Sequence, residues 1–327
     1  MKAPRSDRAA PAPHVTVRPM RAEDLAAAAR IMKQAFGTFL AMPDPLAFGG
    51  DTDFVTSRWK ADPTRAFVME VDGVVAGSNI ATRWGSFGFF GPLSIDPVHW
   101  NKGLSPRLLE PVLERFAMWG CRNTGLYTFA HSPKHHALYQ RFGFHTRFLT
   151  PIFARAAVIS AEEPAPSYLR FSRLSEEERH AALAECRAIT DATEVGLDVT
   201  FEIEAVLAHG LGETLLLSDE AGIAAFAVCH HGPGTEAGSG FCYIKFGAAR
   251  PGPGGAVRMD NLLGACEAYA RDIGIEIVAA GVNTARTEAH DVVRRRGYRA
   301  QIVGVAMHRP NAPGFNRSGA FILDDWR

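Results

Sequence analysis

The chain has 327 residues, of which 47% are hydrophobic and 21% are charged, as is typical of a soluble globular protein. Lysine plus arginine balance aspartate plus glutamate at 35 each, so no basic excess predicts binding to nucleic acid or to an anionic membrane. No apolar run is long enough to cross a bilayer, and the length suits two domains better than one core.

The start of the chain is rich in Ala, Pro and Arg and lacks the apolar stretch of a secretion signal. We therefore expect residues 1–14 to form a flexible tail and the protein to be cytoplasmic. The five cysteines are widely spaced without a CxxC pair, and most are expected to be small core residues. The pairs His135-His136 and His230-His231 lack the i, i+4 spacing of a helical metal site, so no metal site is predicted.

The first predicted elements run strand, helix, strand and strand. Alternation predicts a strand over 15–18, and apolar residues at helical spacing predict a helix over 22–36. The segment 39–53 contains two prolines and a Gly-Gly pair, and we expect it to form a loop over a substrate cleft. Asp72-Gly73 lies between two apolar runs and predicts a β-hairpin.

The stretch 91–113 has the features of an anion-binding site. It opens with a short apolar strand around Ser94, continues as a polar loop over 100–105, and becomes a helix. Ser105 is expected to be the N-cap of that helix and Pro106 its first residue. Free backbone N–H groups and the helix dipole would then converge where a phosphate could bind.

The second half of the sequence repeats the first at a constant offset. Leu262 and Gly297 each lie 154 residues after Leu108 and Gly143, and a strand expected to start at Phe171 lies 154 residues after Val17. A constant offset predicts an internal duplication. The predicted divisions are a tail over 1–14, domains over 15–155 and 168–310, a Pro-rich linker over 156–167, and a tail over 311–327 that contains an apolar run suited to an extra strand.

Two motifs resemble those of the GNAT N-acetyltransferase superfamily. In the acetyl-CoA-binding motif [QR]-x-x-G-x-[GA], Gly103 fills the glycine position and Ser105 the small-residue position, while Trp100 stands where Gln or Arg is usual. Downstream, LYQRFGF at 138–144 is similar to the L-Y-x-x-x-G-F ending of the family. The resemblance implies an α/β fold with two GNAT-like domains in tandem, each a mixed, mainly antiparallel sheet flanked by helices.

The resemblance also implies acetyl-CoA as co-substrate and direct attack on its thioester by the amine of a small molecule. In the family, a backbone N–H at a bulge of the central strand polarises the thioester carbonyl, and a Tyr protonates the departing thiolate. Tyr139 matches that Tyr, although a core aromatic residue is the other interpretation. The implied coenzyme-binding residues are Leu93, Ser94, Ile95, Asn101, Lys102, Gly103, Leu104, Ser105 and Ser132.

The second copy departs further from the family pattern. Val293 stands 154 residues after Tyr139 and cannot donate a proton, although His290 could replace the missing acid. We therefore expect catalysis in the first domain. Catalysis in the second copy, a non-catalytic acyl-CoA-binding or sensing protein, and a pure scaffold are the alternatives.

The residues leave the general base and the amine open. His131, Asp96 and Glu70 could each lie near the amine, and water could act directly. In the loop over 39–53, Asp51 and Asp53 together with apolar residues suggest a mixed apolar and acidic rim around the amine. The protein is expected to be a monomer or a homodimer.

Overall fold

The structure is a computed structural model that describes residues 13–157 and 166–327. The predicted flexible tail over 1–14 and the predicted linker over 156–167 fall mostly outside the described residues. In chain order, the first half contains β1 (Val15–Pro19), α1 (Leu25–Phe39), α2 (Phe54–Ala61), β2 (Ala66–Val71), β3 (Val74–Trp84), β4 (Phe87–Phe90), β5 (Ser94–Ile95), α3 (Ser105–Met118), β6 (Asn123–Phe129), α4 (Pro133–Gln140) and β7 (His145–Ala156).

The second half follows a similar order. Its elements are β8 (Leu169–Arg170), α5 (Glu176–Thr193), α6 (Thr200–His209), β9 (Gly212–Asp219), β10 (Gly222–Gly232), β11 (Gly238–Ala249), α7 (Gly255–Asp272), β12 (Ile277–Gly281), α8 (Thr287–Arg295), β13 (Arg299–Arg309) and β14 (Ile322–Leu323). β6, α4 and β7 begin at 123, 133 and 145, whereas β12, α8 and β13 begin at 277, 287 and 299, in each case 154 residues later. The offset seen in the sequence is therefore an offset between equivalent elements.

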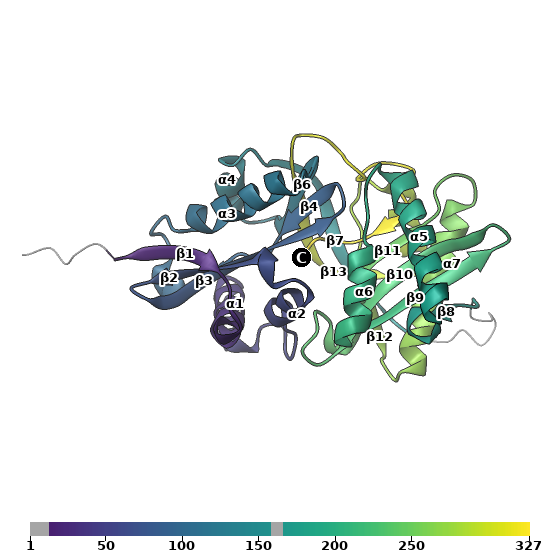
Figure 1. Ribbon diagram of the computed structural model, residues 1–327, viewed down its shortest axis with the longest axis horizontal. Helices are drawn as coiled ribbons and strands as arrows, with labels where there is room; N and C mark the ends of the chain where they lie inside the picture. Colours follow the sequence, from purple (N-terminus) through teal and green to yellow (C-terminus); the bar gives the residue numbers. More distant parts are fainter. Residues whose placement is uncertain (1–12, 158–165) are drawn as a thin grey trace, which may run out of the picture.

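The strands of the first half send alternate side chains into two helical layers. In β2, Ala66 and Val68 pack with Met32 of α1, whereas Phe67 packs with Val112 of α3. Successive side chains of a strand point to opposite faces, so a sheet covered on both sides needs apolar residues at both sets of positions. Figure 1 shows α1 and α2 on one side of these strands and α3 and α4 on the other.

The predicted hairpin and first helix are confirmed. Asp72 and Gly73 join β2 to β3 with φ angles of 52° and 81°, and two positive φ angles are those of a type I′ turn. The helix predicted over 22–36 begins as a 3₁₀ turn at Ala22–Asp24 and continues as α1.

The halves exchange strands in the middle of one continuous sheet. The strand order is β1-β2-β3-β4-β6-β13-β7-β12-β11-β10-β9-β8. β13, from the second half, pairs with β6 of the first, from Gly304↔Phe129 to Arg309↔Thr124. β7, from the first half, pairs with β12 of the second, from Ile277↔Ala156 to Gly281↔Ile152. Neither half closes its sheet with its own strands.

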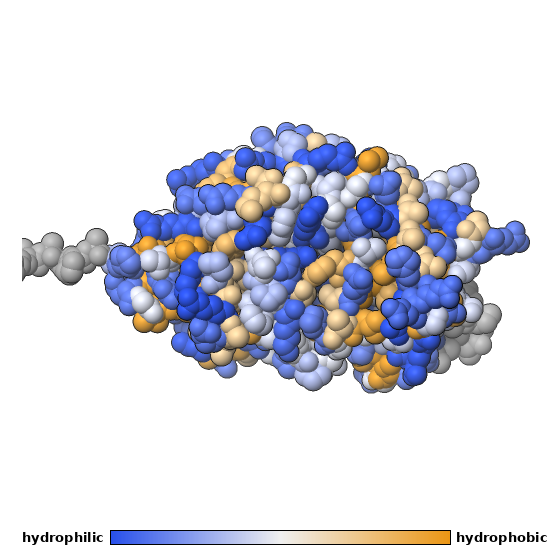
Figure 2. Space-filling model, in the orientation of Figure 1, coloured by the Kyte–Doolittle hydropathy of each residue, from blue (hydrophilic) through white to orange (hydrophobic). Residues whose placement is uncertain are grey.

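The predicted fold class is confirmed, because the protein is a mixed α/β structure with a mainly antiparallel sheet flanked by helices. The parallel pairs in the described sheet are β4 with β6 and β11 with β12. On the face shown in Figure 2, hydrophilic and hydrophobic residues are interspersed over both halves. No helix of the described residues is both long and apolar enough to cross a bilayer. All five cysteines are free, and four of them are buried.

Buried charges join the two halves beside the exchanged strands. The Arg58 guanidinium, from α2, donates to both carboxylate oxygens of Glu236 at 2.9 and 2.7 Å. Lys245 Nζ lies 2.5 Å from Glu236 and 3.3 Å from Glu202. Trp84 of β3 donates its indole N–H to Glu202 at 3.0 Å. A network of this kind fixes how the halves meet, because any of its charges would be costly to bury alone.

The strand expected to start at Phe171 is displaced. Strand β8 ends at Arg170, and Phe171–Arg173 form a 3₁₀ turn. The Glu213 carboxylate accepts hydrogen bonds from the backbone N–H and the hydroxyl of Ser172 at 3.1 and 2.5 Å. A side-chain acceptor therefore takes the place of a neighbouring strand, and the ladder stops.

The last segment of the chain returns to the centre of the molecule. β14 pairs with β11 in the register Gly247↔Leu323 and Ala248↔Ile322, as the apolar run of the tail indicates. The chain then continues to Trp326 and Arg327, and Figure 1 places this end between the two halves.

Candidate active site

A cavity of about 620 Å³ opens where β4 and β6 separate. The two strands pair in parallel from Phe87↔Asn123 to Phe90↔Leu126, and the residues that follow them line the cavity. Further walls come from α1, from the start of α3, from α4, from β13 and from the end of the chain. The volume lies within the range of small-molecule sites.

The central strand is interrupted at the cavity. Residues 91–93 separate β4 from β5. β4 pairs with both β3 and β6, whereas among the described residues β5 pairs with β3 alone, through Gly77↔Ile95 and Ser78↔Ser94. The Leu93 amide N–H has no acceptor among the described residues. Its position at the break leaves it available to a carbonyl oxygen in the cavity.

The loop before α3 presents unpaired amides. Asn101 and Gly103 have φ angles of 62° and 68°, and such left-handed residues turn successive N–H groups toward one side. In the described part of the chain, the amides of residues 102–105 donate no hydrogen bond. With the positive end of the α3 dipole, they form a site suited to phosphate oxygens.

The prediction that Ser105 is the N-cap was wrong by one residue. Leu104 occupies the N-cap position with helical dihedral angles, and Ser105 is the first helical residue. No side chain caps the helix, and Arg107 N donates to Leu104 O at 3.1 Å. An apolar N-cap leaves the first N–H groups free for a ligand.

Trp100 and Lys134 flank residues 101–105, the amide loop. The Trp100 indole donates to Ile95 O at 2.7 Å, which holds the ring against β5. Lys134 Nζ lies 5.5 Å from the centre of that ring and donates to Asn101 Oδ1 at 2.9 Å. A positive charge from α4 therefore stands beside the loop, where the motif would usually place the polar group of Gln or Arg.

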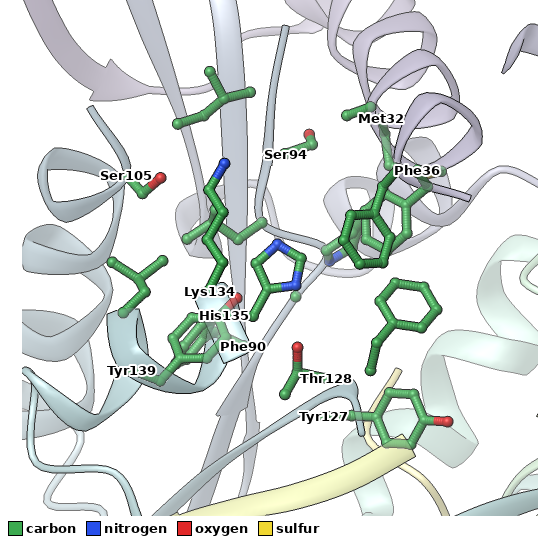
Figure 3. Close-up of a pocket in the computed structure, with 18 of the residues that line it drawn as sticks. Met32, Phe36, Phe90, Ser94, Ser105, Tyr127, Thr128, Lys134, His135 and Tyr139 are labelled. Carbon is green, nitrogen blue, oxygen red and sulfur yellow. The ribbon is translucent and has the colours of Figure 1, made fainter. Parts of the chain in front are cut away.

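Tyr139 faces the cavity from α4. Its ring is 7% exposed and packs edge-on against Phe90, with ring centres 5.7 Å apart. The hydroxyl makes no hydrogen bond with the described residues and is not sealed from the cavity. Burial raises the pKa of the phenol well above its ordinary value, so Tyr139 stays protonated and can donate. Figure 3 shows Tyr139 and Ser105 on one side of the cavity and Met32 and Phe36 on the other.

The sequence of residues 34–144 matches the family model described as Acetyltransferase (GNAT) family. This match to a GNAT acetyltransferase domain covers about a third of the chain. The matched residues include the amide loop, the break between β4 and β5, and Tyr139, so the matched segment contains much of the cavity lining. No curated protein matches the chain in sequence.

Solved structures share the GNAT fold over both halves of the chain. A candidate acetyltransferase from Pyrococcus horikoshii aligns with a TM-score of 0.67 at 12% identity, over 94% of this chain and 93% of that one. A GCN5-related N-acetyltransferase from Sphaerobacter thermophilus aligns with a TM-score of 0.60 at 16% identity, over 90% and 95%. A GCN5-related N-acetyltransferase from Anabaena variabilis gives 0.55 at 14% identity, over 90% and 72%. At these identities the likeness is one of fold.

Most of the predicted GNAT site residues line the cavity. Those that do so are Leu93, Ser94, Ile95, Asn101, Gly103, Leu104, Ser105 and Tyr139. Lys102 and Ser132 do not line it. Lys102 is exposed, and its Nζ lies 3.5 Å from His99 Nδ1. Ser132 is buried behind the start of α4, where its carbonyl accepts from the His135 amide at 3.1 Å.

The cavity contains a histidine that was not among the predicted site residues. His135 lies between the two sides of the cavity in Figure 3, and its ring centre is 4.9 Å from that of Phe39. Burial lowers the pKa of the imidazole, and the neighbouring Lys134 lowers it further. His135 is therefore neutral at pH 7 and able to accept a proton. The sequence held a signal for this residue, because a histidine in the first turn of a helix that follows a strand is a candidate for proton transfer.

None of the three residues considered as a general base lines the cavity. Glu70 accepts hydrogen bonds from Arg18 at 2.9 and 2.5 Å, and Asp96 accepts one from the Val98 amide at 3.1 Å. His131 lies against Phe39 on the exposed side, with ring centres 5.9 Å apart.

The predicted acidic rim is absent from the residues that line the cavity. Asp51 accepts from the amide and hydroxyl of Ser239 at 3.0 and 2.5 Å, and so joins the two halves. Asp53 caps α2 by accepting from the Thr56 amide at 2.8 Å. Donors from Ser239 and Thr56 thus hold the two carboxylates away from the cavity. In the described residues, no group of three or more metal-ligating side chains could hold a metal ion.

In the second half, the end of the chain occupies the equivalent cleft. β10 covers one edge of β11 at Gly247, so β14, which pairs with the same residue, lies on the β12 side. A methyl group on Gly281 at the end of β12 would lie 2.3 Å from Asp325. A methyl group on Gly255, the first residue of α7, would lie 2.3 Å from the Phe321 ring. Phe321 therefore covers the helix start that corresponds to the amide loop.

Buried contacts hold this segment in place. Arg286 donates to Ile322 O at 3.0 Å and pairs with Asp324 at 2.8 Å. Burial raises the pKa of Asp324 to about 6 against the opposing effect of Arg286. Val293, the counterpart of Tyr139, is fully buried in α8, and His290 packs edge-on against Phe153 at 5.6 Å. Neither lines the cavity of the first half.

Proposed function

We propose that the protein is an acetyl-CoA-dependent N-acetyltransferase whose first half transfers the acetyl group to a small-molecule amine. One contrast carries the proposal: the cleft between β4 and β6 is open and leads to unpaired amides and Tyr139, whereas the cleft between β11 and β12 is filled by residues 320–325. A helix start covered by a phenyl ring has no room for a diphosphate, so the second half serves as scaffold.

The coenzyme would supply the acetyl group as a thioester. The amides of 102–105 and the Lys134 ammonium suit its phosphates, and the apolar side chains of Leu93, Leu104 and Leu138 suit its pantetheine arm. The Leu93 amide is placed to donate to the thioester carbonyl as negative charge develops on it.

Proton transfer falls to two residues of α4. As the amine nitrogen attacks the carbonyl carbon and the C–S bond breaks, Tyr139 donates its proton to the departing sulfur. His135 takes a proton from the nitrogen and passes it, through solvent, back to the tyrosinate. The products are an amide and a free thiol, and no net proton is gained or lost. The raised pKa of Tyr139 fits this role, because the phenol keeps its proton near pH 7 and is available as a donor.

Thermal unfolding with and without acetyl-CoA tests the coenzyme site. Saturation at 100 times the Kd stabilises a protein by about 2.7 kcal/mol, which is a measurable rise in Tm. Tyr139→Phe should keep this rise but slow thiol release by about 100-fold or more, the usual contribution of a general acid. Tyr298→Phe is the matched control, because Tyr298 is equally buried and does not line the cavity.

Each outcome has a distinct meaning. No rise in Tm would refute the proposed coenzyme site. Unchanged turnover in Tyr139→Phe would refute the proposal that Tyr139 is the general acid. A rise in Tm without thiol release from any amine would favour the alternative function, a non-catalytic acyl-CoA-binding or sensing protein. The departure at Trp100 from the usual Gln or Arg is the observation in favour of that alternative.

A further inference from the structure

The side of the cavity opposite the amide loop is lined by aromatic rings. Phe36 and Phe39 come from α1, Phe48 from the following loop, Phe129 from β6 and Trp326 from the end of the chain. The ring centres of Phe36 and Phe48 are 5.3 Å apart, and those of Phe39 and Phe129 are 4.9 Å apart. Rings packed in this way present apolar faces and edges to the cavity, against which the ring of a ligand can pack.

No carboxylate side chain is among the described residues that line this cavity. Its charged side chains are those of Lys134, Arg141 and Arg327, all of them basic. Arg327 is occupied, since its guanidinium lies 3.9 Å from the centre of the Tyr243 ring. A second ammonium on the acceptor would enter apolar surroundings with no carboxylate side chain to pair with, which disfavours its binding. Polyamines are therefore poor acceptors, and the apolar rings offer no hydrogen-bond partners to the hydroxyl groups of an aminosugar.

The attacking nitrogen must also be neutral. The titratable side chains that line the cavity, apart from its basic ones, are His99, His135, Tyr127 and Tyr139. Of these, His135 contacts the aromatic side, with its ring centre 4.9 Å from that of Phe39, and its lowered pKa keeps it uncharged near pH 7. Apolar walls disfavour an ammonium ion, so the amine must give up its proton as it enters the site.

We infer that the acceptor is a primary alkyl amine that carries an aromatic ring, a single basic nitrogen and no further positive charge. The inference rests on the proposed function and names the substrate class of the same site. The ring of the amine lies among Phe39, Phe129 and Trp326, and its nitrogen points toward His135. Trp326 and Ile302 belong to the second half, so this half sets specificity while the first half supplies the chemistry.

Equilibrium binding to the protein loaded with free CoA tests the inference without turnover. The ligands are 2-phenylethylamine, spermidine and glucosamine, titrated by calorimetry at pH 8. We expect 2-phenylethylamine to bind at least about tenfold more tightly than the other two, the discrimination that one apolar group gives in a pocket. Equal or weaker binding of 2-phenylethylamine would overturn the inference.

Turnover with the same amines separates this inference from the proposed function. Preferred binding of 2-phenylethylamine without thiol release would refute the proposed transferase but not the aromatic site. Faster thiol release with hexanoyl-CoA than with acetyl-CoA, together with no preference among the amines, would assign the aromatic side to a longer acyl chain and overturn the inference.

Two variants locate the aromatic site. Phe39→Ala should reduce the preference for 2-phenylethylamine at least about tenfold and leave the acetyl-CoA shift in Tm intact, since Phe39 lies away from the amide loop. Trp326→Leu should reduce the preference to a similar degree, and a retained rise in Tm with acetyl-CoA would show that this variant is folded. Phe148→Ala is the control, because Phe148 is 43% exposed and does not line the cavity. An unchanged preference in both Phe39→Ala and Trp326→Leu would contradict the assigned site.

Discussion

The substitution Glu236→Gln tests whether buried charges hold the two halves together. Glu236 is 3% exposed and accepts hydrogen bonds from both Arg58 and Lys245. Burial alone would raise the pKa of Glu236, but these two cations lower it far below its ordinary value. Glutamine keeps the shape of the side chain and removes the charge, so Arg58 would lose its carboxylate partner while Lys245 would keep Glu202, 3.3 Å away.

The expected cost follows from the burial of the pair. Removing one partner of a buried ion pair destabilises proteins by about 3–5 kcal/mol, because the charge left behind is not solvated. For a chain of this size, that loss corresponds to a fall of roughly 5–10 °C in Tm. Urea unfolding followed by circular dichroism at pH 7 measures the change in the free energy of unfolding directly.

A solvent-exposed pair provides the control. Glu194 pairs with Arg317 at 2.6 Å, but the Arg317 side chain is 44% exposed. Glu194→Gln should therefore cost at most about 1 kcal/mol. If Glu236→Gln costs no more than Glu194→Gln, the buried network does not stabilise the contact between the halves, and the reasoning is wrong.

Three further predictions concern stability. Burial lowers the pKa of His230 to about 4, so the unfolded chain takes up a proton at this residue before the folded chain does as pH falls below 6.5. The folded state therefore loses stability in acid, and His230→Gln should restore about 3 kcal/mol of unfolding free energy at pH 4 but little at pH 8. Urea titration at both pH values measures this difference. Residues 13–157 expressed alone should aggregate or melt without a cooperative transition in calorimetry, because β6 lacks β13; a cooperative monomeric melt would contradict this. Gly255→Ala should cost about 1–3 kcal/mol in thermal unfolding through its clash with Phe321, and an unchanged Tm would show that the tail is not packed there.

Local patterns in the sequence predicted local structure well. Asp72-Gly73 requires two positive φ angles, and that demand alone located the hairpin. The offset of 154 residues indicated the duplication, and α8 and β13 do begin 154 residues after α4 and β7. The amide loop could be anticipated because Gly103 and Pro106 constrain the backbone itself.

Partnerships between distant segments could not be predicted in this way. β7 and β13 are equivalent strands with similar apolar patterns, so nothing local indicates that each completes the other half's sheet. Asp51 suits a substrate rim as well as a structural contact, and the choice depends on Ser239 from the other half. Trp326 reaches the cavity only because β14 carries the chain there.

The exchange of β7 and β13 has a consequence for synthesis on the ribosome. The first half is made early, but the neighbour of β6 is not available until residue 309 has emerged. At about 5–20 residues per second, the nascent first half waits roughly 10–30 s with an exposed strand edge. The cavity acquires its Trp326 wall later still, so a partly synthesised chain has no complete acceptor pocket.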